Sequence, residues 1–266
     1  MTRLAVAPGV FHWPGYLASD EQAALVADLR EVARLAPFFQ PRMPKTGKPF
    51  SVRMTNCGSL GWVSDEAGYR YQPLHPVTGE PWPPMPAVLS RAWQDLAAYP
   101  HPPQACLVNF YEASAKMGLH QDRDEQEFDA PVLSLSLGDT AVFRIGGTQR
   151  GGKTVSLKLG SGDALVFGGE ARLAYHGIDR ILAGSSALLP QGGRINLTLR
   201  RVTKPGDRRQ RGSSAPGRFG NDQPSRIEPA RRPKPAASPP IITTAGPKPK
   251  CVSSAVAAAP AAAAVT

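Results

Sequence analysis

The sequence predicts an α+β domain in which helices cover one face of an antiparallel β-sandwich or barrel, followed by a disordered tail. Apolar residues recur at helical spacing within residues 1–105, alternate with polar residues within 106–203, and give way to a proline-rich, basic segment in 204–266. We therefore divide the chain into an N-terminal helical region (1–105), a β-rich core (106–203) and a basic Pro/Ala-rich tail (204–266).

Two helices are predicted in the N-terminal region. The first follows Ser19, the expected N-cap, and stops before Pro37. The second lies between Pro86 and Pro100. Both carry an apolar stripe at helical spacing, which is typical of a surface that packs on a sheet. The stripes consist of Leu25, Val26, Leu29, Val32 and Leu35 in the first helix and Val88, Leu89, Ala92, Trp93 and Leu96 in the second.

The strands of the core are predicted from alternation with a period of two. Residues 133–137, 155–159 and 195–199 each alternate apolar with polar side chains, and glycines separate these runs. Several short strands at close spacing favour a sandwich or a closed barrel. We therefore expect the N-terminal helices to cover one sheet of this core.

The positive charge of the chain lies mainly in its tail. Residues 204–266 hold 11 Lys/Arg against 3 Asp/Glu, whereas residues 1–203 hold 20 against 18. The tail also contains 11 prolines, and its only aromatic residue is Phe219, so it cannot bury enough apolar surface to fold. It is interpreted either as an arm that attracts phosphate backbones or, preferably, as a solvated extension.

Composition excludes several classes of protein. The three cysteines, Cys57, Cys106 and Cys251, are widely spaced and form no C-x-x-C pair, which disfavours a disulfide framework and a thiolate zinc site. No apolar run reaches the roughly 20 residues that cross a bilayer. The N-terminus does not resemble a signal peptide. We expect a cytoplasmic protein that makes no contact with membranes.

Three side chains are candidates for a metal site. His120 and Asp122 are two residues apart, so in an extended segment they face the same way. With His176 they would place two imidazoles and one carboxylate on one side of a metal ion, which leaves positions open for a chelating cosubstrate and oxygen. A zinc hydrolase site remains an alternative at this stage.

A second polar cluster is compatible with an anion site. In residues 194–200 two arginines and two further polar residues share one face of a predicted strand, and a guanidinium can bind a carboxylate bidentately. An ordinary solvent-facing strand side is the alternative. Two more polar residues share a face on the strand before His120 and could bind the same anion. The candidates are Arg194, Asn196, Thr198 and Arg200, joined by Asn109 and Tyr111.

Taken together in this order, these motifs resemble the bacterial AlkB dioxygenases. The resemblance runs from about Phe11 to Val202, and several independent motifs support it. They are residues 109–111 (NFY), 118–125 (GLHQDRDE), 134–138 (SLSLG), 168–172 (GGEAR), 175–177 (YHG) and 194–200 (RINLTLR). Residues 54–62 (MTNCGSLGW), 68–71 (GYRY) and 81–83 (PWP) resemble the nucleotide-recognition region of that family.

The resemblance implies a double-stranded β-helix (jelly-roll) core that uses iron(II), 2-oxoglutarate and O2. It assigns three groups of residues. The iron ligands would be His120, Asp122 and His176; the 2-oxoglutarate pocket Asn109, Tyr111, Arg194, Asn196 and Arg200; and the base and phosphate contacts Trp62, Tyr69, Tyr71, Asp124 and Arg150. Arg194 would bind the distal carboxylate of 2-oxoglutarate.

The function that the resemblance implies is oxidative demethylation of bases such as 1-methyladenine and 3-methylcytosine in DNA, with RNA left open. Succinate, CO2 and formaldehyde would be released. These bases are cationic, so Asp124 would pair with their charge and Trp62 would stack on them. The base would be single-stranded or flipped out of a duplex. We expect a monomer.

Two alternatives compete with this function. A related dioxygenase acting on RNA, a protein or a small molecule would share the iron and 2-oxoglutarate sites. A basic module that binds nucleic acid without catalysis would depend on the tail and need no metal. The nearly balanced charge of residues 1–203 disfavours the second alternative.

Overall fold

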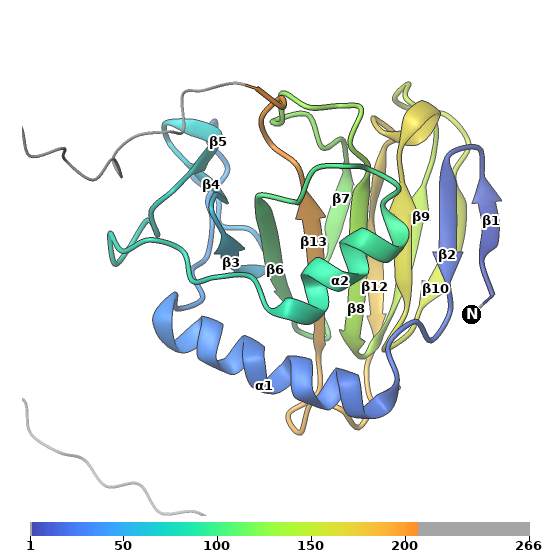
Figure 1. Cartoon of the computed structure of the whole chain (residues 1–266), viewed down its shortest axis with the longest axis horizontal. Coiled ribbons are helices and arrows are strands. Elements are labelled where there is room, and N and C mark those ends of the chain that lie inside the picture. Colours follow the sequence, from blue (N-terminus) through green and yellow to red (C-terminus); the bar gives the residue numbers. More distant parts are fainter. Residues whose placement is uncertain (1, 207–266) are drawn as a thin grey trace, which may run out of the picture. The chain divides into compact units, whose positions relative to one another are not determined.

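The computed structural model describes residues 2–206, and Figure 1 shows their arrangement. The predicted disordered tail lies outside the described residues, apart from residues 204–206. Residues 1–105 and 106–203, which sequence patterns separate, belong to one compact unit. Cys57 and Cys106 are buried free thiols, and Cys251 lies outside the described residues. Within residues 2–206, no helix is long and apolar enough to cross a membrane.

The larger of two facing sheets has seven antiparallel strands. Three of them come from the N-terminal region, for which the sequence predicted only helices. For β3 the reason is that its central residues, 54–57, are buried on both faces, so polar and apolar residues do not alternate there. Across the sheet the order is β1 (Leu4–Ala7), β2 (Val10–Trp13), β11 (Ala164–Phe167), β8 (Val132–Gly138), β13 (Arg194–Arg200), β6 (Ala105–Tyr111) and β3 (Arg53–Gly58).

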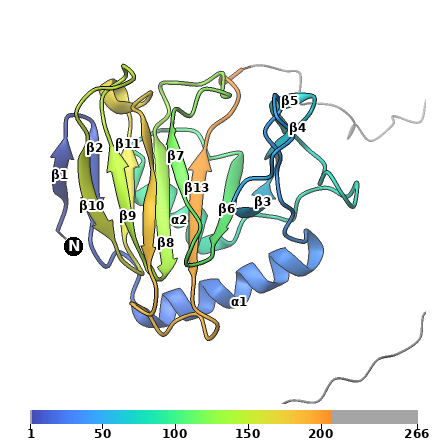
Figure 2. The ribbon, with the colours of Figure 1, turned by 180° about the vertical axis from the view of Figure 1, so that it is seen from behind.

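The smaller sheet has four strands and is best seen from behind the major sheet (Figure 2). Its order is β10 (Val155–Leu159), β9 (Thr140–Ile145), β12 (His176–Leu182) and β7 (Met117–His120). A separate hairpin of β4 (Gly61–Asp65) and β5 (Gly68–Gln72) lies beyond β3 (Figures 1 and 2). A short 3-10 turn, η1 (Gly169–Ala171), precedes β12.

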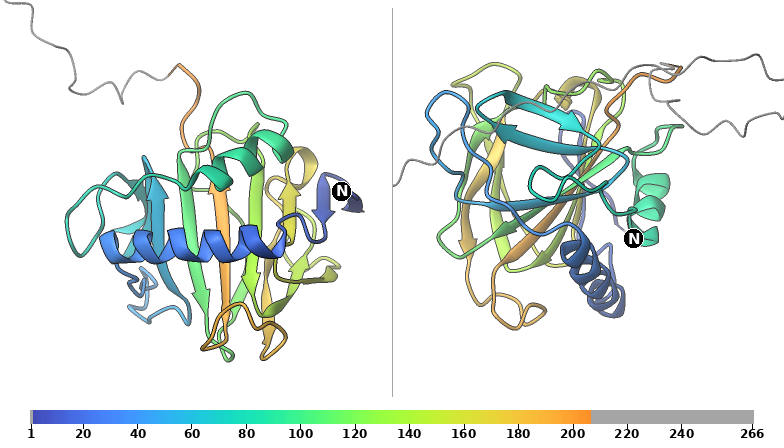
Figure 3. Two further views of the ribbon diagram at one scale, coloured as in Figure 1. Left: turned by 60° about the horizontal axis from the view of Figure 1, so that its bottom comes forward. Right: turned by 90° about the vertical axis from the view of Figure 1, so that its left-hand side faces the viewer.

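The two predicted helices, α1 (Ser19–Leu35) and α2 (Ala87–Leu96), lie on the same side of the major sheet (Figures 1 and 3). Their buried stripes pack against the leucines of β8 and β13 in one apolar cluster. Burial of each of these leucine side chains contributes about 1.5–3 kcal/mol to the free energy of unfolding. The predicted N-cap was wrong by one residue. Ala18 caps α1, and its backbone N–H donates to the Glu21 carboxylate (3.0 Å).

A second apolar cluster, which includes Phe143, Ile145, Phe167 and Ile178, lies between the two sheets. Helices on one outer face and a packed interior between two antiparallel sheets confirm the predicted jelly-roll. Because the two sheets face each other, polar side chains that point inward from both sheets meet in the interior.

Candidate metal centre and cosubstrate pocket

The two histidines of the candidate metal centre are direct cross-strand neighbours. His120 ends β7, His176 begins β12, and the two residues are register partners. Paired residues on adjacent antiparallel strands point to the same face, so the ring centroids lie only 4.5 Å apart. Gly177 allows this close approach, because a Cβ there would lie 2.5 Å from the Met117 carbonyl oxygen.

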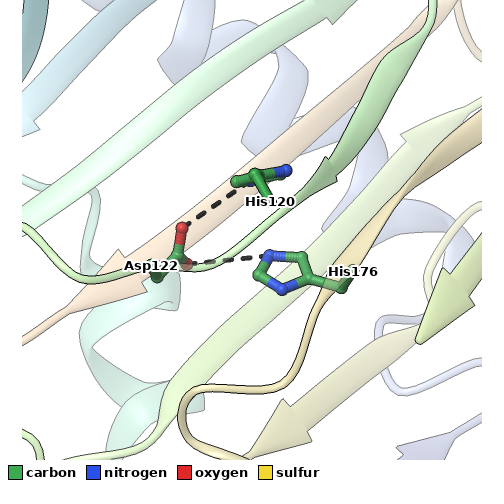
Figure 4. Close-up of side chains that lie close together, drawn as sticks. All are labelled: His120, Asp122 and His176. Carbon is green, nitrogen blue, oxygen red and sulfur yellow. Dashed lines mark ion pairs between the residues drawn. The ribbon is translucent and has the colours of Figure 1, made fainter. Parts of the chain in front are cut away.

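Asp122 completes the cluster from the loop after β7. Its Oδ1 lies 3.7 Å from His120 Nε2, and its Oδ2 lies 3.8 Å from His176 Nε2 (Figure 4). The three candidate ligand atoms all lie within 4.8 Å of one another. The Asp122 and His176 side chains are buried, whereas that of His120 is 42% exposed. An ion bound here would therefore be open to further ligands on one side only.

Backbone carbonyls set the tautomer of both imidazoles. His120 Nδ1 lies 3.0 Å from the Gly118 carbonyl oxygen, and His176 Nδ1 lies 2.9 Å from that of Ala174. Because a carbonyl can only accept, the proton of each neutral ring sits on Nδ1 and the Nε2 lone pair faces Asp122. Burial and the neighbouring His120 lower the pKa of His176 to about 4, which keeps it neutral and able to bind a metal.

Arg200 fixes the carboxylate. Its Nε and Nη2 both donate to Asp122 Oδ2, at 2.9 and 2.7 Å. Burial alone would raise the pKa of Asp122, but Arg200 and the two imidazoles outweigh burial and hold it well below its usual range. Asp122 is therefore an anion at neutral pH, as an iron ligand must be.

Acid should destabilise the metal-free protein through His176. The unfolded chain protonates this residue near pH 6.5 and the folded chain only near pH 4. The unfolded state thus binds more protons between these values, so the stabilisation is complete above pH 6.5 and is lost as the pH falls to 4. We expect a loss on the order of 3 kcal/mol, measured by denaturant unfolding with a chelator present. A His176→Gln variant should lack this part of the pH dependence; an equal dependence in both proteins would contradict the prediction.

The candidate cosubstrate pocket is built from paired strand residues. Arg194 and Asn196 on β13 are register partners of Tyr111 and Asn109 on β6. All four side chains line the same cavity. Burial raises the pKa of Tyr111 to about 12, so its hydroxyl remains a hydrogen-bond donor. The polar face of residues 194–200 therefore lines the interior cavity, and the solvent-facing alternative is wrong.

Arg194 shows that this pocket suits an anion. Its side chain is fully buried and donates to the Leu159 carbonyl (3.1 Å) and to Ser136 Oγ (2.9 Å). Its Nε has no hydrogen-bond partner, and no ion pair of Arg194 occurs within residues 2–206. Burial lowers its pKa to about 10. Because an unpaired buried cation is costly, a carboxylate of 2-oxoglutarate fits this position.

The mouth of the cavity is aromatic and acidic. Trp62 and Tyr69 stack with their ring centroids 5.7 Å apart and their planes within 16°. The Trp62 indole N–H donates to Asp124 Oδ2 (2.7 Å). Asp124 and Arg150 are exposed at this mouth. These side chains therefore offer a flat ring surface beside a carboxylate and a cation.

All of the site residues named from the sequence line one cavity of about 620 Å³. The cavity brings the three predicted groups together, and its lining includes both the fully buried Arg194 and the exposed Tyr69. Its lining includes Asn109, Tyr111, Arg194, Asn196 and Arg200; His120, Asp122 and His176; and Trp62, Tyr69, Tyr71, Asp124 and Arg150.

Two residues that were assigned no role from the sequence support this site. Glu125 and Arg172 form a buried ion pair (3.1 Å), and Arg172 Nη1 also donates to the backbone carbonyl of Asp122 (2.9 Å). Arg172 follows η1, 47 residues after Glu125, so sequence spacing could not link them. The available signal was that each of them ends a motif of the family resemblance, residues 118–125 and 168–172.

Comparison with known proteins decides the family. Residues 9–200 match the family model described as the 2OG-Fe(II) oxygenase superfamily. The AlkB homolog of Caulobacter vibrioides, an alpha-ketoglutarate-dependent dioxygenase, is 58% identical over 199 residues, which cover 75% of this chain and 90% of that protein. The chain belongs to the AlkB family of dioxygenases. It uses Fe(II), 2-oxoglutarate and O2.

Further AlkB relatives agree with this assignment. AlkB of Escherichia coli is 45% identical over 184 residues, covering 68% of this chain and 84% of that protein. An Arabidopsis thaliana relative, named DNA N(6)-methyladenine demethylase ALKBH1C, is 32% identical over 73% of this chain and 49% of its own length. The solved structure of OsALKBH1 superimposes with a TM-score of 0.64 at 32% identity, covering 75% of this chain and all of that one.

Proposed function

We propose that this AlkB-family protein removes alkyl groups from cationic nucleobases of the 1-methyladenine and 3-methylcytosine type, in DNA and, as a second substrate, in RNA. The observation that carries the proposal is the single cavity that joins the metal centre to the aromatic, acidic mouth. Iron and 2-oxoglutarate would supply oxidation of the N-methyl group, with succinate, CO2 and formaldehyde as products. The Arabidopsis relative, named a DNA demethylase, supports a nucleic-acid substrate.

The roles of the residues follow from their places in the cavity. His120, Asp122 and His176 would hold the iron, and Arg194 with Tyr111 would hold the distal carboxylate of 2-oxoglutarate. The remaining pocket residues, Asn109, Asn196 and Arg200, would complete the cosubstrate site. These three residues would leave other positions on the iron for the cosubstrate and oxygen.

At the mouth, the aromatic surface would bind the base. Trp62 would stack on a methylated cationic base with a cation–π contribution of about 0.5–2 kcal/mol. Asp124 would face the positive charge, and Arg150 would contact a backbone phosphate. A base inside a duplex cannot reach the buried iron, so the substrate would be a single-stranded or flipped base.

An Asp124→Asn variant should act less well on cationic than on neutral alkylated bases. Asparagine can still accept the Trp62 N–H bond but removes the charge, which is worth about 1–2 kcal/mol for a charged partner at this exposed position. We therefore expect kcat/KM to fall about 5- to 30-fold for 3-methylcytosine and little for a neutral alkylated base. Formaldehyde release from matched single-stranded oligonucleotides measures both. Equal losses on the two substrates would contradict charge pairing.

The main competing proposal is a related dioxygenase that acts on another substrate. Titration with methylated and unmethylated oligonucleotides of one sequence distinguishes the two, because only a base demethylase releases formaldehyde in proportion to the methylated oligonucleotide. A basic binding module without catalysis would instead lose nucleic-acid binding when the chain is shortened to end at Thr203, and would not depend on iron.

We also propose that the protein works as a monomer in the cytoplasm. The cavity is complete within one chain, which supports a monomeric active form. Light scattering across a range of protein concentrations would test the oligomeric state.

A further inference from the structure

Two side-chain hydrogen bonds fasten the β4–β5 hairpin to the segment that carries the iron ligand Asp122. Trp62 and Tyr71 are register partners on the two strands of the hairpin. The Trp62 indole donates to Asp124 (2.7 Å), and the Tyr71 hydroxyl donates to Glu125 Oε1 (2.5 Å). Two paired side chains near the open end of the hairpin therefore contact two consecutive acids that follow the metal ligand Asp122.

The bond from Tyr71 continues into a buried network that ends at the metal ligand. Arg200 lies 3.4 Å from Glu125 Oε1 through its Nε, and its Nη1 lies 3.4 Å from the Tyr71 hydroxyl oxygen. The same guanidinium makes the two shorter bonds to Asp122 Oδ2. Arg172 holds the other Glu125 oxygen (3.1 Å). The hairpin and the metal ligand thus share one arginine.

We propose that Tyr71 is a positioning residue that couples the β4–β5 hairpin to Asp122 through Glu125 and Arg200, rather than a contact for the base. Its hydroxyl is already used inside this network. The ring of Tyr71 packs separately on a small apolar cluster of Leu60, Ala105 and Val202, so ring and hydroxyl have different functions. The hydroxyl satisfies Glu125, which leaves Arg200 free to hold Asp122 by two bonds.

Loss of the hydroxyl should redirect Arg200. Without the Tyr71 donor, Glu125 Oε1 would compete with Asp122 for the guanidinium, which already lies within 3.4 Å of it. Asp122 would then be held less firmly as a ligand. Partners beyond the ligands themselves change metal affinity 10- to 100-fold when mutated, and Tyr71 acts one step further away. We expect about a three- to tenfold loss of metal affinity.

The experiment compares Tyr71→Phe with Tyr16→Phe. Tyr16 is a matched control, since its hydroxyl donates to a carboxylate, Asp95, at 2.7 Å on α2 and outside the cavity. Mn²⁺ affinity is measured by titration with 2-oxoglutarate present, and unfolding is measured in parallel. The expected result is weaker Mn²⁺ binding in Tyr71→Phe alone. Equal Mn²⁺ affinity in Tyr71→Phe and the unsubstituted protein would overturn the proposal.

Amide hydrogen exchange tests the coupling directly. In the unsubstituted protein, binding of Mn²⁺ and 2-oxoglutarate should slow exchange in Gly61–Asp65 and Gly68–Gln72, and this part does not require a well-folded variant. In Tyr71→Phe, most of this slowing should be lost. Unchanged exchange of the hairpin on loading would also overturn the proposal. The inference rests on the proposed function only in assuming that the hairpin contacts the base. Neither measurement uses nucleic acid, so the two proposals can fail separately.

Discussion

An Asp122→Ala variant should lose metal binding and formaldehyde release almost completely. It removes the only carboxylate of the metal centre and leaves Arg200 buried without its two shortest bonds. A site reduced to two imidazoles binds iron(II) weakly. We expect activity to fall by at least about 100-fold, because mutating a residue that only supports a metal ligand already lowers activity about 10- to 100-fold. Formaldehyde release and Mn²⁺ titration measure the two losses.

The same variant should also be less stable, by about 3–5 kcal/mol, because it breaks a buried ion pair on one side. Asp179→Ala is a suitable control, since that residue pairs with Arg144 (3.1 Å) at the surface of the same small sheet. It should retain both metal binding and turnover. A folded Asp122→Ala protein that still couples 2-oxoglutarate turnover to formaldehyde release would refute the ligand assignment.

An Arg194→Met variant should lose 2-oxoglutarate binding while the metal-free protein remains as stable as before, or becomes more stable. The loss follows because removing one partner of a buried charge-assisted pair with a carboxylate costs about 3–5 kcal/mol, or roughly 100- to 4000-fold in Kd. The free energy of unfolding should not fall, because Arg194 has no ion-pair partner within residues 2–206. Its buried charge therefore destabilises the protein when no 2-oxoglutarate is bound.

Thermal unfolding with Mn²⁺ and increasing 2-oxoglutarate separates these two effects. In the unsubstituted protein, 2-oxoglutarate at 100 times its Kd should add about 2.7 kcal/mol of stability, and the variant should show almost none of this gain. Arg201→Met serves as the control, since Arg201 donates to backbone carbonyls away from the cavity. A normal 2-oxoglutarate response in Arg194→Met would show that another group holds the cosubstrate.

Most of the site could be predicted from the sequence because its residues lie on short, regular segments. The alternation in residues 194–200 places Arg194 and Asn196 on one face, and strand pairing then brings Tyr111 and Asn109 opposite them. Periodicity predicts the faces of a strand but not its partners. The spacing of His120 and His176 along the chain could therefore not predict that they are register partners.

What sequence reasoning missed depends on contacts between distant segments. Tyr71 was assigned to the base, but its hydroxyl donates to Glu125, and nothing in the spacing of these residues indicates this bond. The strand β3 was missed for a different reason. Its central residues, 54–57, are buried on both faces, so polar and apolar residues do not alternate there.

The pairing of β7 with β12 makes the metal centre depend on strand alignment. A shift of one residue between these strands would turn one imidazole to the opposite face of the sheet, and the centre would disappear although the sandwich could still form. Gly177 restricts the alignment, because a larger residue would collide with the backbone of β7. The ability to bind the metal ion therefore indicates whether β7 and β12 have paired in the correct register. A chain with these strands misaligned could fold and still fail to bind the metal.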